Sequence, residues 1–331
     1  MSKRKGSRQR KRNNFRKALL VCEIILIGLV LLGGSSLTRS ALARQEKNSE
    51  YPQVMEAAET PEPEPSAAPE PTSVPTPEFS WDNYKVIAHA LGGLDGMTYL
   101  NSKESFVKYY EKGFRLFEVD LTKTSDGMWV CRHSWNSSLG QWEGDKKQVL
   151  SAETFLSTPL YGKYTPMSLK ELFLLLKDYP DAFILLDSKQ YSVRNYQRTL
   201  EDYSEYVEIA KAVGAERVLG QLIPEIYNEA MFSGAVLMGE FPTYMYSLWQ
   251  KYSVKELKTI ARFCKEKGIP AATINEKYWS EKVQKIFDDQ GILLYIYTVN
   301  DRDKAGTLLE KGAAGICTDY LTEQDLQQPS S

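Results

Sequence analysis

The sequence predicts an α/β fold in which one (β/α)8 TIM barrel follows an N-terminal transmembrane helix and a proline-rich linker. Short aliphatic and β-branched runs recur through residues 81–326, and several are separated by helical segments. Strands that are apolar along their whole length are typical of a parallel sheet covered by helices. These roughly 245 residues suit a single barrel. A doubly wound sheet is the second possibility.

The N-terminus predicts membrane targeting. Residues 1–17 carry nine Lys or Arg and no acid, and an apolar run follows at 18–38. That run has about the 20 residues that a membrane-spanning helix needs. The basic end is expected in the cytoplasm, with the rest of the chain outside a cell membrane that it crosses once. The alternative is a secretory signal peptide cleaved after Ala43, which would release the domain.

A linker follows at residues 39–80, rich in proline and glutamate. Its segment 60–79 tends to polyproline II and spans roughly 60 Å at about 3.1 Å per residue. Residues 18–331 carry 32 basic and 43 acidic residues, a net charge of −11. This acidity argues against nucleic acid as a partner. The domain at 81–326, followed by a tail at 327–331, is expected to be a monomer.

The four cysteines show no metal-binding or redox spacing, so those of the domain are expected to be small buried hydrophobes.

The sequence predicts the following strands and helices along the domain. Strands are predicted at 84–89, 114–121, 128–133, 182–189, 217–223, 235–240, 271–275, 292–300 and 315–319. Helices are predicted at 102–113, 168–179, 253–268 and 301–312. Asn101 and Glu104 are expected to cap the first of these helices.

One stretch, "FEVDLTKTSDGMWVCRH" (117–133), brings acids and a histidine together. Asp126-Gly127 is a two-residue hairpin signal, and a hairpin centred there would place His133 directly opposite Asp120. Glu118, two residues before Asp120, points to the same side. The competing interpretation of this stretch is an exposed polar face on a hairpin.

Other predicted strands also end in polar groups, as barrel active sites require. One ends at His89, and another ends with Asp187 and Lys189, which share a face. Three carboxylates (Glu118, Asp120, Asp187) are hard oxygen ligands for Mg²⁺ or Ca²⁺. Together with Lys189 the metal would offset the charge of a phosphate, while His89 and His133, the only histidines of the chain, transfer protons. The set predicts metal-dependent phosphodiester cleavage.

From about Val86 to Thr322 the chain resembles the glycerophosphodiester phosphodiesterases, within the superfamily of phosphatidylinositol-specific phospholipase C barrels. The resemblance is carried by a strand ending in His89, the Glu118-Val-Asp120 strand, the turn "TKTSDG", His133 and the ending "YIYTVNDRDKAGTLLEKGAAGICTDY". It implies a hydrolase of glycerophosphodiesters or lysophospholipid head-group diesters. Trp135, on the face of His133 if its strand continues, is expected to line the substrate site beside Lys189, with a packing role as the alternative.

The chain departs from the family at three places. Ala90 stands where the family has an arginine, Ser134 follows His133 in place of aspartate, and the Pro-Glu-Asn-Thr signature reads Tyr99-Leu100-Asn101-Ser102. The remaining acids and lysine resemble the sphingomyelinase D-like branch, so phospholipid cleavage of that type is an alternative. The others are a catalytically degenerate barrel that binds a phosphorylated surface polymer, and an assembly protein.

The proton-transfer roles of the two histidines are expected to differ. Asp120 opposite His133 favours the imidazolium, so His133 is expected to have the higher pKa and to act as the acid. His89, on an apolar strand, is then the base.

Overall fold

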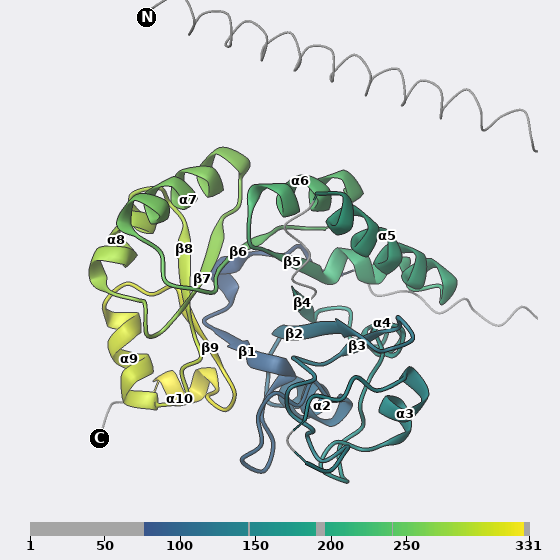
Figure 1. The fold of residues 1–331 in the computed structure, drawn as a ribbon. Helices are drawn as coiled ribbons and strands as arrows, with labels where there is room; N and C mark the ends of the chain where they lie inside the picture. Colours follow the sequence, from purple (N-terminus) through teal and green to yellow (C-terminus); the bar gives the residue numbers. More distant parts are fainter. Residues whose placement is uncertain (1–75, 145, 190–195, 240, 328–331) are drawn as a thin grey trace, which may run out of the picture. The chain divides into compact units, whose positions relative to one another are not determined.

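The computed structural model describes residues 76–144, 146–189, 196–239 and 241–327, and they confirm the predicted barrel (Figure 1). Eight parallel strands form a closed sheet, because β1 pairs with β9 on one side and with β2 on the other. The strands are β1 Val86–Ala88, β2 Leu116–Lys123, β4 Phe183–Ser188, β5 Leu222–Ile226, β6 Met245–Leu248, β7 Ala271–Asn275, β8 Leu293–Tyr297 and β9 Gly315–Thr318.

Helices follow most strands and lie outside the ring of strands (Figure 1). They are α2 Lys103–Glu111, α3 Ala152–Ser157, α4 Leu169–Leu176, α5 Tyr196–Ala212, α6 Glu229–Met238, α7 Val254–Lys267, α8 Glu281–Asp288, α9 Arg302–Glu310 and α10 Glu323–Gln327. Local sequence sets their ends. Helix α7 begins with a capping box between Ser253 and Glu256 and ends at the left-handed Gly268.

The predicted transmembrane helix at 18–38 lies outside the described residues, as do the segment 1–17 and most of the linker. In the part of the chain that is described, every helix is too short or too polar to cross a bilayer.

Alternate residues of each strand point into the barrel, and their polarity changes along the strand. Near the amino ends an apolar layer fills the interior; it contains Ile87, Leu116, Phe183, Leu185, Ile223, Met245, Ala271, Tyr295 and Cys317. Trp81, from the short 3-10 helix η1 (Trp81–Asn83), packs on this layer with its ring centroid 5.5 Å from that of Tyr295. Polar side chains follow toward the carboxyl ends, so the polar part of the interior lies at one end of the barrel.

Two further apolar clusters surround the strands. The larger one lies between the sheet and the helices and includes Phe106, Phe173, Tyr206 and Phe287. The smaller one holds the segment between β3 (Trp129–Cys131) and α4 and includes Leu100, Trp135 and Phe155. The described domain cysteines, Cys131, Cys264 and Cys317, are all buried free thiols, as expected.

One predicted strand is wrong, and another was placed too early in the chain. The described part of the strand predicted at 235–240 is not a strand, because 235–238 complete helix α6, where Val236 and Leu237 are exposed. The neighbouring strand is β6, four residues long. Residues 217–221 lie in a 3-10 helix (η4, Glu216–Gln221), and β5 begins only at Leu222. Short apolar runs do not distinguish helix from strand by their periodicity alone.

The predicted hairpin exists, but its register differs by one residue. Strand β3 runs antiparallel to β2 and pairs Cys131 with Leu121. The loop has three residues, 125–127, because the Gly127 N–H donates to the Thr124 carbonyl at 3.1 Å and Gly127 adopts φ 87°. A turn followed by a left-handed glycine is a common three-residue hairpin. Arg132, and not His133, therefore lies opposite Asp120, its N–H donating to the Asp120 carbonyl at 2.8 Å.

Candidate active site

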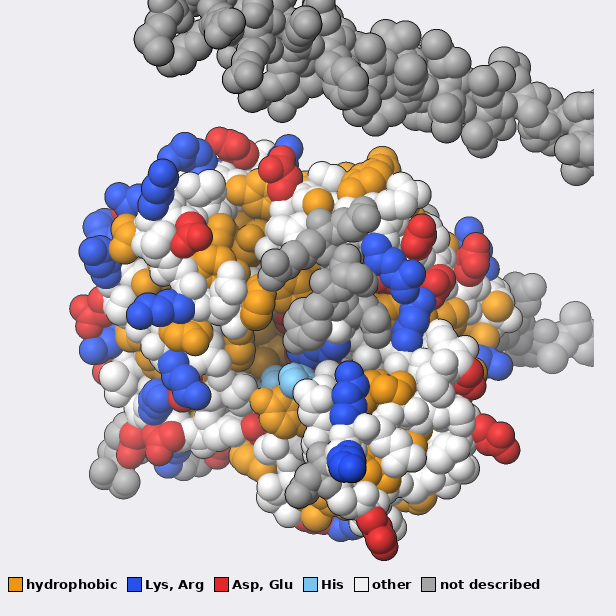
Figure 2. Space-filling model, viewed as in Figure 1, with side chains coloured by type: hydrophobic (Ala, Val, Ile, Leu, Met, Phe, Trp, Pro, Cys, Tyr) orange, Lys and Arg blue, Asp and Glu red, His pale blue; other side chains and the backbone are white. Residues whose placement is uncertain are grey.

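A cavity of about 240 Å³ opens at the carboxyl ends of the strands. Figure 2 shows the hollow at the centre of this face, with histidine atoms at its edge. Its lining includes His89, His133, Glu118, Asp187 and Lys189. The structure thus brings these five predicted site residues, which lie on or shortly after four strands, β1 to β4, to one place, and both histidines open on the same cavity.

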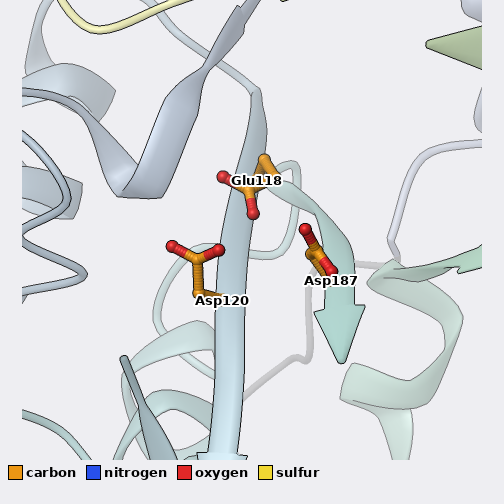
Figure 3. A group of neighbouring side chains, drawn as sticks. All are labelled: Glu118, Asp120 and Asp187. Carbon is orange, nitrogen blue, oxygen red and sulfur yellow. The ribbon is translucent and has the colours of Figure 1, made fainter. Parts of the chain in front are cut away.

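The three predicted carboxylates form one cluster. Glu118 and Asp120 extend from β2, and Asp187 extends from the neighbouring strand β4 (Figure 3). One oxygen from each lies within 4.8 Å of the others. Asp187 also accepts a hydrogen bond from the Tyr227 hydroxyl.

The backbone and Asn101 orient the two acids of β2. The Ala90 N–H donates to Glu118 Oε2 at 2.7 Å. Asn101 binds Asp120 twice: its Nδ2 donates to Oδ2 at 2.8 Å, and its Oδ1 accepts from the Asp120 N–H at 3.0 Å. Asn101 is fully buried, and through these two hydrogen bonds it positions Asp120.

Lys189 is the cation of the cluster. Its Nζ lies 2.8 Å from Asp120 Oδ1 and also contacts Asp187. Burial alone would lower the pKa of Lys189, but the carboxylates of Asp120, Asp187 and Glu118 outweigh it and raise the pKa. Lys189 is therefore charged and offsets one of three neighbouring acids.

The acids respond to this environment in opposite ways. Burial, followed by the charge of Asp120, raises the pKa of Glu118. Burial also acts to raise the pKa of Asp120, but Lys189 and the histidines outweigh it and lower the pKa to about 2. The cluster holds more negative charge than Lys189 can balance.

These residues fit a divalent metal ion. Glu118 belongs to the cluster, and its Oε1 is buried and has no hydrogen-bond partner within the described residues. A buried carboxylate oxygen without a partner costs free energy unless a ligand satisfies it. Oxygen donors from three carboxylates are the ligands that Mg²⁺ and Ca²⁺ prefer.

His89 is held by a carboxylate on the last strand of the barrel. Its Nδ1 lies 2.7 Å from Asp319 Oδ1, and Asp319 Oδ2 accepts from Asn300 Nδ2 at 2.6 Å. Because a carboxylate only accepts, Nδ1 of His89 carries a proton and Nε2 is the reactive nitrogen. Asp319 therefore contributes to the site through His89.

His133 follows strand β3, and its surroundings correct the expectation that its pKa is raised. Burial lowers the pKa of His133 and outweighs the opposing charge of Asp120. The expectation of a raised pKa assumed that His133 faces Asp120 directly, which the register of the hairpin excludes. His133 is therefore suited to accept a proton.

For three residues the structure shows a different place or role from the one expected from the sequence. Trp135 does not line the cavity: it is buried in the small apolar cluster, and its Nε1 donates to the Lys123 carbonyl at 3.0 Å. The helix cap is Ser102 instead of Asn101, because Ser102 has the extended backbone of a cap and accepts from the Ser105 N–H. Glu104 binds Thr165.

Sequence reasoning missed Glu225 on β5, which also lines the cavity. It is buried, and burial together with Asp187 raises its pKa to about 8. Glu225 lies two residues after the inward-facing Ile223, so strand alternation would have predicted that it points into the barrel. The prediction missed it because the strand was placed too early in the chain.

Comparison with known proteins agrees with this geometry. The profile of the glycerophosphoryl diester phosphodiesterase family matches residues 93–323, which include every predicted site residue except His89. No significant match was found among curated proteins.

Solved structures share the fold. A glycerophosphodiester phosphodiesterase from Parabacteroides distasonis is 18% identical, with a TM-score of 0.56 over 73% of this chain and 94% of that one. A phosphodiesterase from Oleispira antarctica, in complex with the product sn-glycerol-3-phosphate, is 18% identical, with a TM-score of 0.54 over 74% and 95%. One from Thermotoga maritima is 20% identical, with a TM-score of 0.52 over 71% and 93%.

Proposed function

The chain belongs to the glycerophosphoryl diester phosphodiesterase family, and on that premise we propose that it hydrolyses glycerophosphodiesters or related lysophospholipid head-group diesters with a divalent metal ion and two histidines. Membership of the family makes it a phosphoric diester hydrolase. The observation that carries the finer proposal is the cavity in which three clustered carboxylates, a lysine and two histidines meet. The glycerol-3-phosphate product of the Oleispira antarctica enzyme supports a glycerol phosphate diester as substrate.

Glu118, Asp120 and Asp187 are the residues that would hold Mg²⁺ or Ca²⁺. Such an ion supplies a Lewis acid that offsets charge on the phosphoryl oxygens. Lys189 adds a fixed positive charge beside the same oxygens, because the surrounding carboxylates outweigh the effect of its burial and keep it protonated. Asn101 and the Ala90 N–H keep the two acids of β2 in place.

Proton transfer is divided between the histidines. His133, with a lowered pKa, is neutral and accepts the proton of the attacking nucleophile, which is water in hydrolysis. His89 presents Nε2 to the cavity and donates a proton to the leaving oxygen, while Asp319 at 2.7 Å balances the positive charge of the ring. This order reverses the one that the sequence predicted.

One observation favours the sphingomyelinase D-like alternative. Leu100, at the place of the family's further glutamate ligand, is 1% exposed and packs in the small apolar cluster. The acidic cluster found within the described residues therefore has three members. Such a site would suit attack by a hydroxyl of the substrate itself and give a cyclic phosphate, whereas hydrolysis gives an open monoester.

Incubation of the full chain with a panel of glycerophosphodiesters and lysophospholipids tests the proposal, with products identified by mass spectrometry. We expect product release that EDTA stops and Mg²⁺ or Ca²⁺ restores. Glu118→Gln should raise the metal concentration needed for activity, whereas Glu104→Gln, outside the cavity, should not. Turnover that is indifferent to EDTA, or none on any diester of the panel, would favour a degenerate binding barrel.

We further propose that the basic and apolar residues of 1–38 anchor the chain in the cell membrane with the barrel outside. The sequence supports this placement through its charge asymmetry. Protease added to intact cells should digest the barrel and leave a membrane-bound fragment. A soluble chain that begins after Ala43 would support the secreted alternative, and a barrel protected in intact cells would contradict both.

A further inference from the structure

The loop between β1 and α2 places an aromatic ring in contact with both histidines. The ring centroid of Tyr99 lies 4.8 Å from that of His89 and 4.8 Å from that of His133, with the rings edge to face. Twice this distance is the upper limit for the separation of the two imidazoles. Tyr99 lines the cavity beside both and is 38% exposed.

The backbone that presents this ring is strained. Tyr99 has φ 58°, in the left-handed region, and the same loop holds other positive-φ residues: Ala90, Leu91, Asp95 and Asn101. Strain of this kind persists where the surrounding structure imposes it, and it concentrates at functional sites. Proline, which the family signature has at this place, fixes φ near −65° and cannot adopt this backbone. The placement of the ring is thus a property of this chain.

The contacts involve the ring of Tyr99 more than its hydroxyl. Among the described aromatic side chains, only the two histidines make ring contacts with Tyr99. The hydroxyl forms no hydrogen bond with another described residue. Burial and the charges of Asp120 and Asp319 raise the pKa of Tyr99, so the phenol stays neutral and does not compete for protons.

We propose that Tyr99 is a positioning residue whose ring holds His89 and His133 apart at the spacing that one phosphodiester requires. The inference rests on the proposed function, because it assumes that both histidines act on the same diester. A base and an acid that serve the attacking and the leaving oxygen must stand on opposite sides of the phosphorus, each within hydrogen-bond reach. A rigid ring between two imidazoles maintains that separation at little cost in conformational entropy.

Three substitutions at position 99 separate the ring from the backbone. Tyr99→Phe keeps the ring and should retain most of the rate. Tyr99→Leu and Tyr99→Gly should each lower kcat on an alkyl diester by on the order of 10²-fold, the effect of an ångström of misplacement. Because glycine tolerates positive φ, Tyr99→Gly should melt at or above the temperature of the wild type while losing activity.

Tyr161 provides the matched control. It is also a tyrosine with positive φ, 51°, and it is 41% exposed, but it does not line the cavity. Tyr161→Leu should leave the rate unchanged. A fall like that of Tyr99→Leu would show that loss of any strained tyrosine is sufficient, and it would overturn the inference.

A nitrophenyl diester tests whether the lost rate concerns proton transfer, because its leaving group needs no proton. The defect of Tyr99→Leu should be several-fold smaller on this substrate, since only one histidine must remain in place. A variant that merely loosened the fold would lose the same factor on both substrates. Equal losses, or a Tyr99→Phe defect as large as that of Tyr99→Leu, would overturn the inference.

Nuclear magnetic resonance tests the placement without activity, because the full chain contains only two histidines. The ring current of Tyr99 should shift the imidazole C–H signals of both. Tyr99→Leu should move both signals, and Tyr99→Phe should leave them near their wild-type positions. Unmoved signals would overturn the placement. A wild-type chain without diesterase activity would instead overturn the proposed function and the catalytic part of this inference, while moved signals would retain the placement.

Discussion

The imidazole of His133 shows how burial can outweigh a nearby charge. Its ring lies in the same cavity as three acids, Glu118, Asp187 and Glu225. The loss of water around the ring nevertheless lowers the pKa of His133 below the ordinary value. In the proposed function, the acid is chosen from a geometric contact, between His89 and Asp319, and the base from the environment of its ring. Neither the contact with Asp319 nor the burial of His133 can be predicted from the spacing of the histidines in the sequence.

The lowered pKa of His133 gives a prediction for the pH dependence of the reaction. A base with a lowered pKa loses its proton earlier as the pH rises, so the acidic limb of kcat/KM should lie below pH 6.5, the ordinary value for histidine. His133→Ala should abolish this limb and lower the rate by on the order of 10² to 10⁴. A pH–rate profile of the metal-saturated chain provides the measurement. An acidic limb above pH 6.5, or one that survives in His133→Ala, would contradict the assignment.

The β2–β3 hairpin determines the position of His133, which follows β3. The site therefore depends on the turn of this hairpin. Gly127 has φ 87° and open space around the position of an added Cβ. Gly127→Ala should therefore destabilise the protein by about 1–2 kcal/mol through the backbone alone. The measurement is the free energy of unfolding in urea.

Gly306 provides the opposite case. It lies inside helix α9 without a positive φ, and an added Cβ would again meet nothing. Gly306→Ala should raise the free energy of unfolding by about 0.5–1 kcal/mol, since alanine favours the helix. Two alanine substitutions of the same sign would contradict the backbone argument.

The elements also show what could be predicted from the sequence. The i, i+2 spacing in β2 placed Glu118 and Asp120 on one inward face, and the same rule placed Asp187 beside Lys189, because side chains alternate along any strand. The hairpin register was missed because the length of the loop depends on the left-handed Gly127. Trp135 was missed because β3 ends at Cys131, after which alternation no longer applies.

Loop geometry limited the prediction elsewhere. Asn101 matched a capping pattern in the sequence, but its φ of 48° is incompatible with a cap and turns its side chain to Asp120. Such a backbone depends on tertiary contacts across the barrel mouth. The position of Tyr99 between the histidines has the same origin.

At the scale of the whole molecule, stability is linked to the acids inside the barrel. The pKa of Glu225 is raised to about 8, chiefly by burial. Between its ordinary value and pH 8 the folded chain holds a proton that the unfolded chain releases. The free energy of unfolding should therefore fall as the pH rises through this range, by at most about 1.4 kcal/mol per pH unit for one group.

Glu225→Gln tests this linkage, because an amide stays neutral at every pH. Urea unfolding in EDTA from pH 5 to 8 should show a smaller slope for Glu225→Gln than for the wild type. Some slope should remain, since burial also raises the pKa of Asp202, to about 6, with the same sign. Glu111→Gln, at an exposed position, should keep the full slope. Identical slopes in all three chains would contradict the argument.

The apolar layer at the amino ends of the strands, which includes Trp81, closes the inner end of the cavity within the described residues. A diester therefore enters the cavity from the carboxyl ends of the strands, and its two fragments leave by the same route. The fragment nearer the outside must therefore leave first, and the deeper one waits behind it. A substrate with a long chain can be accepted only head first, with its tail still in the surrounding water or lipid.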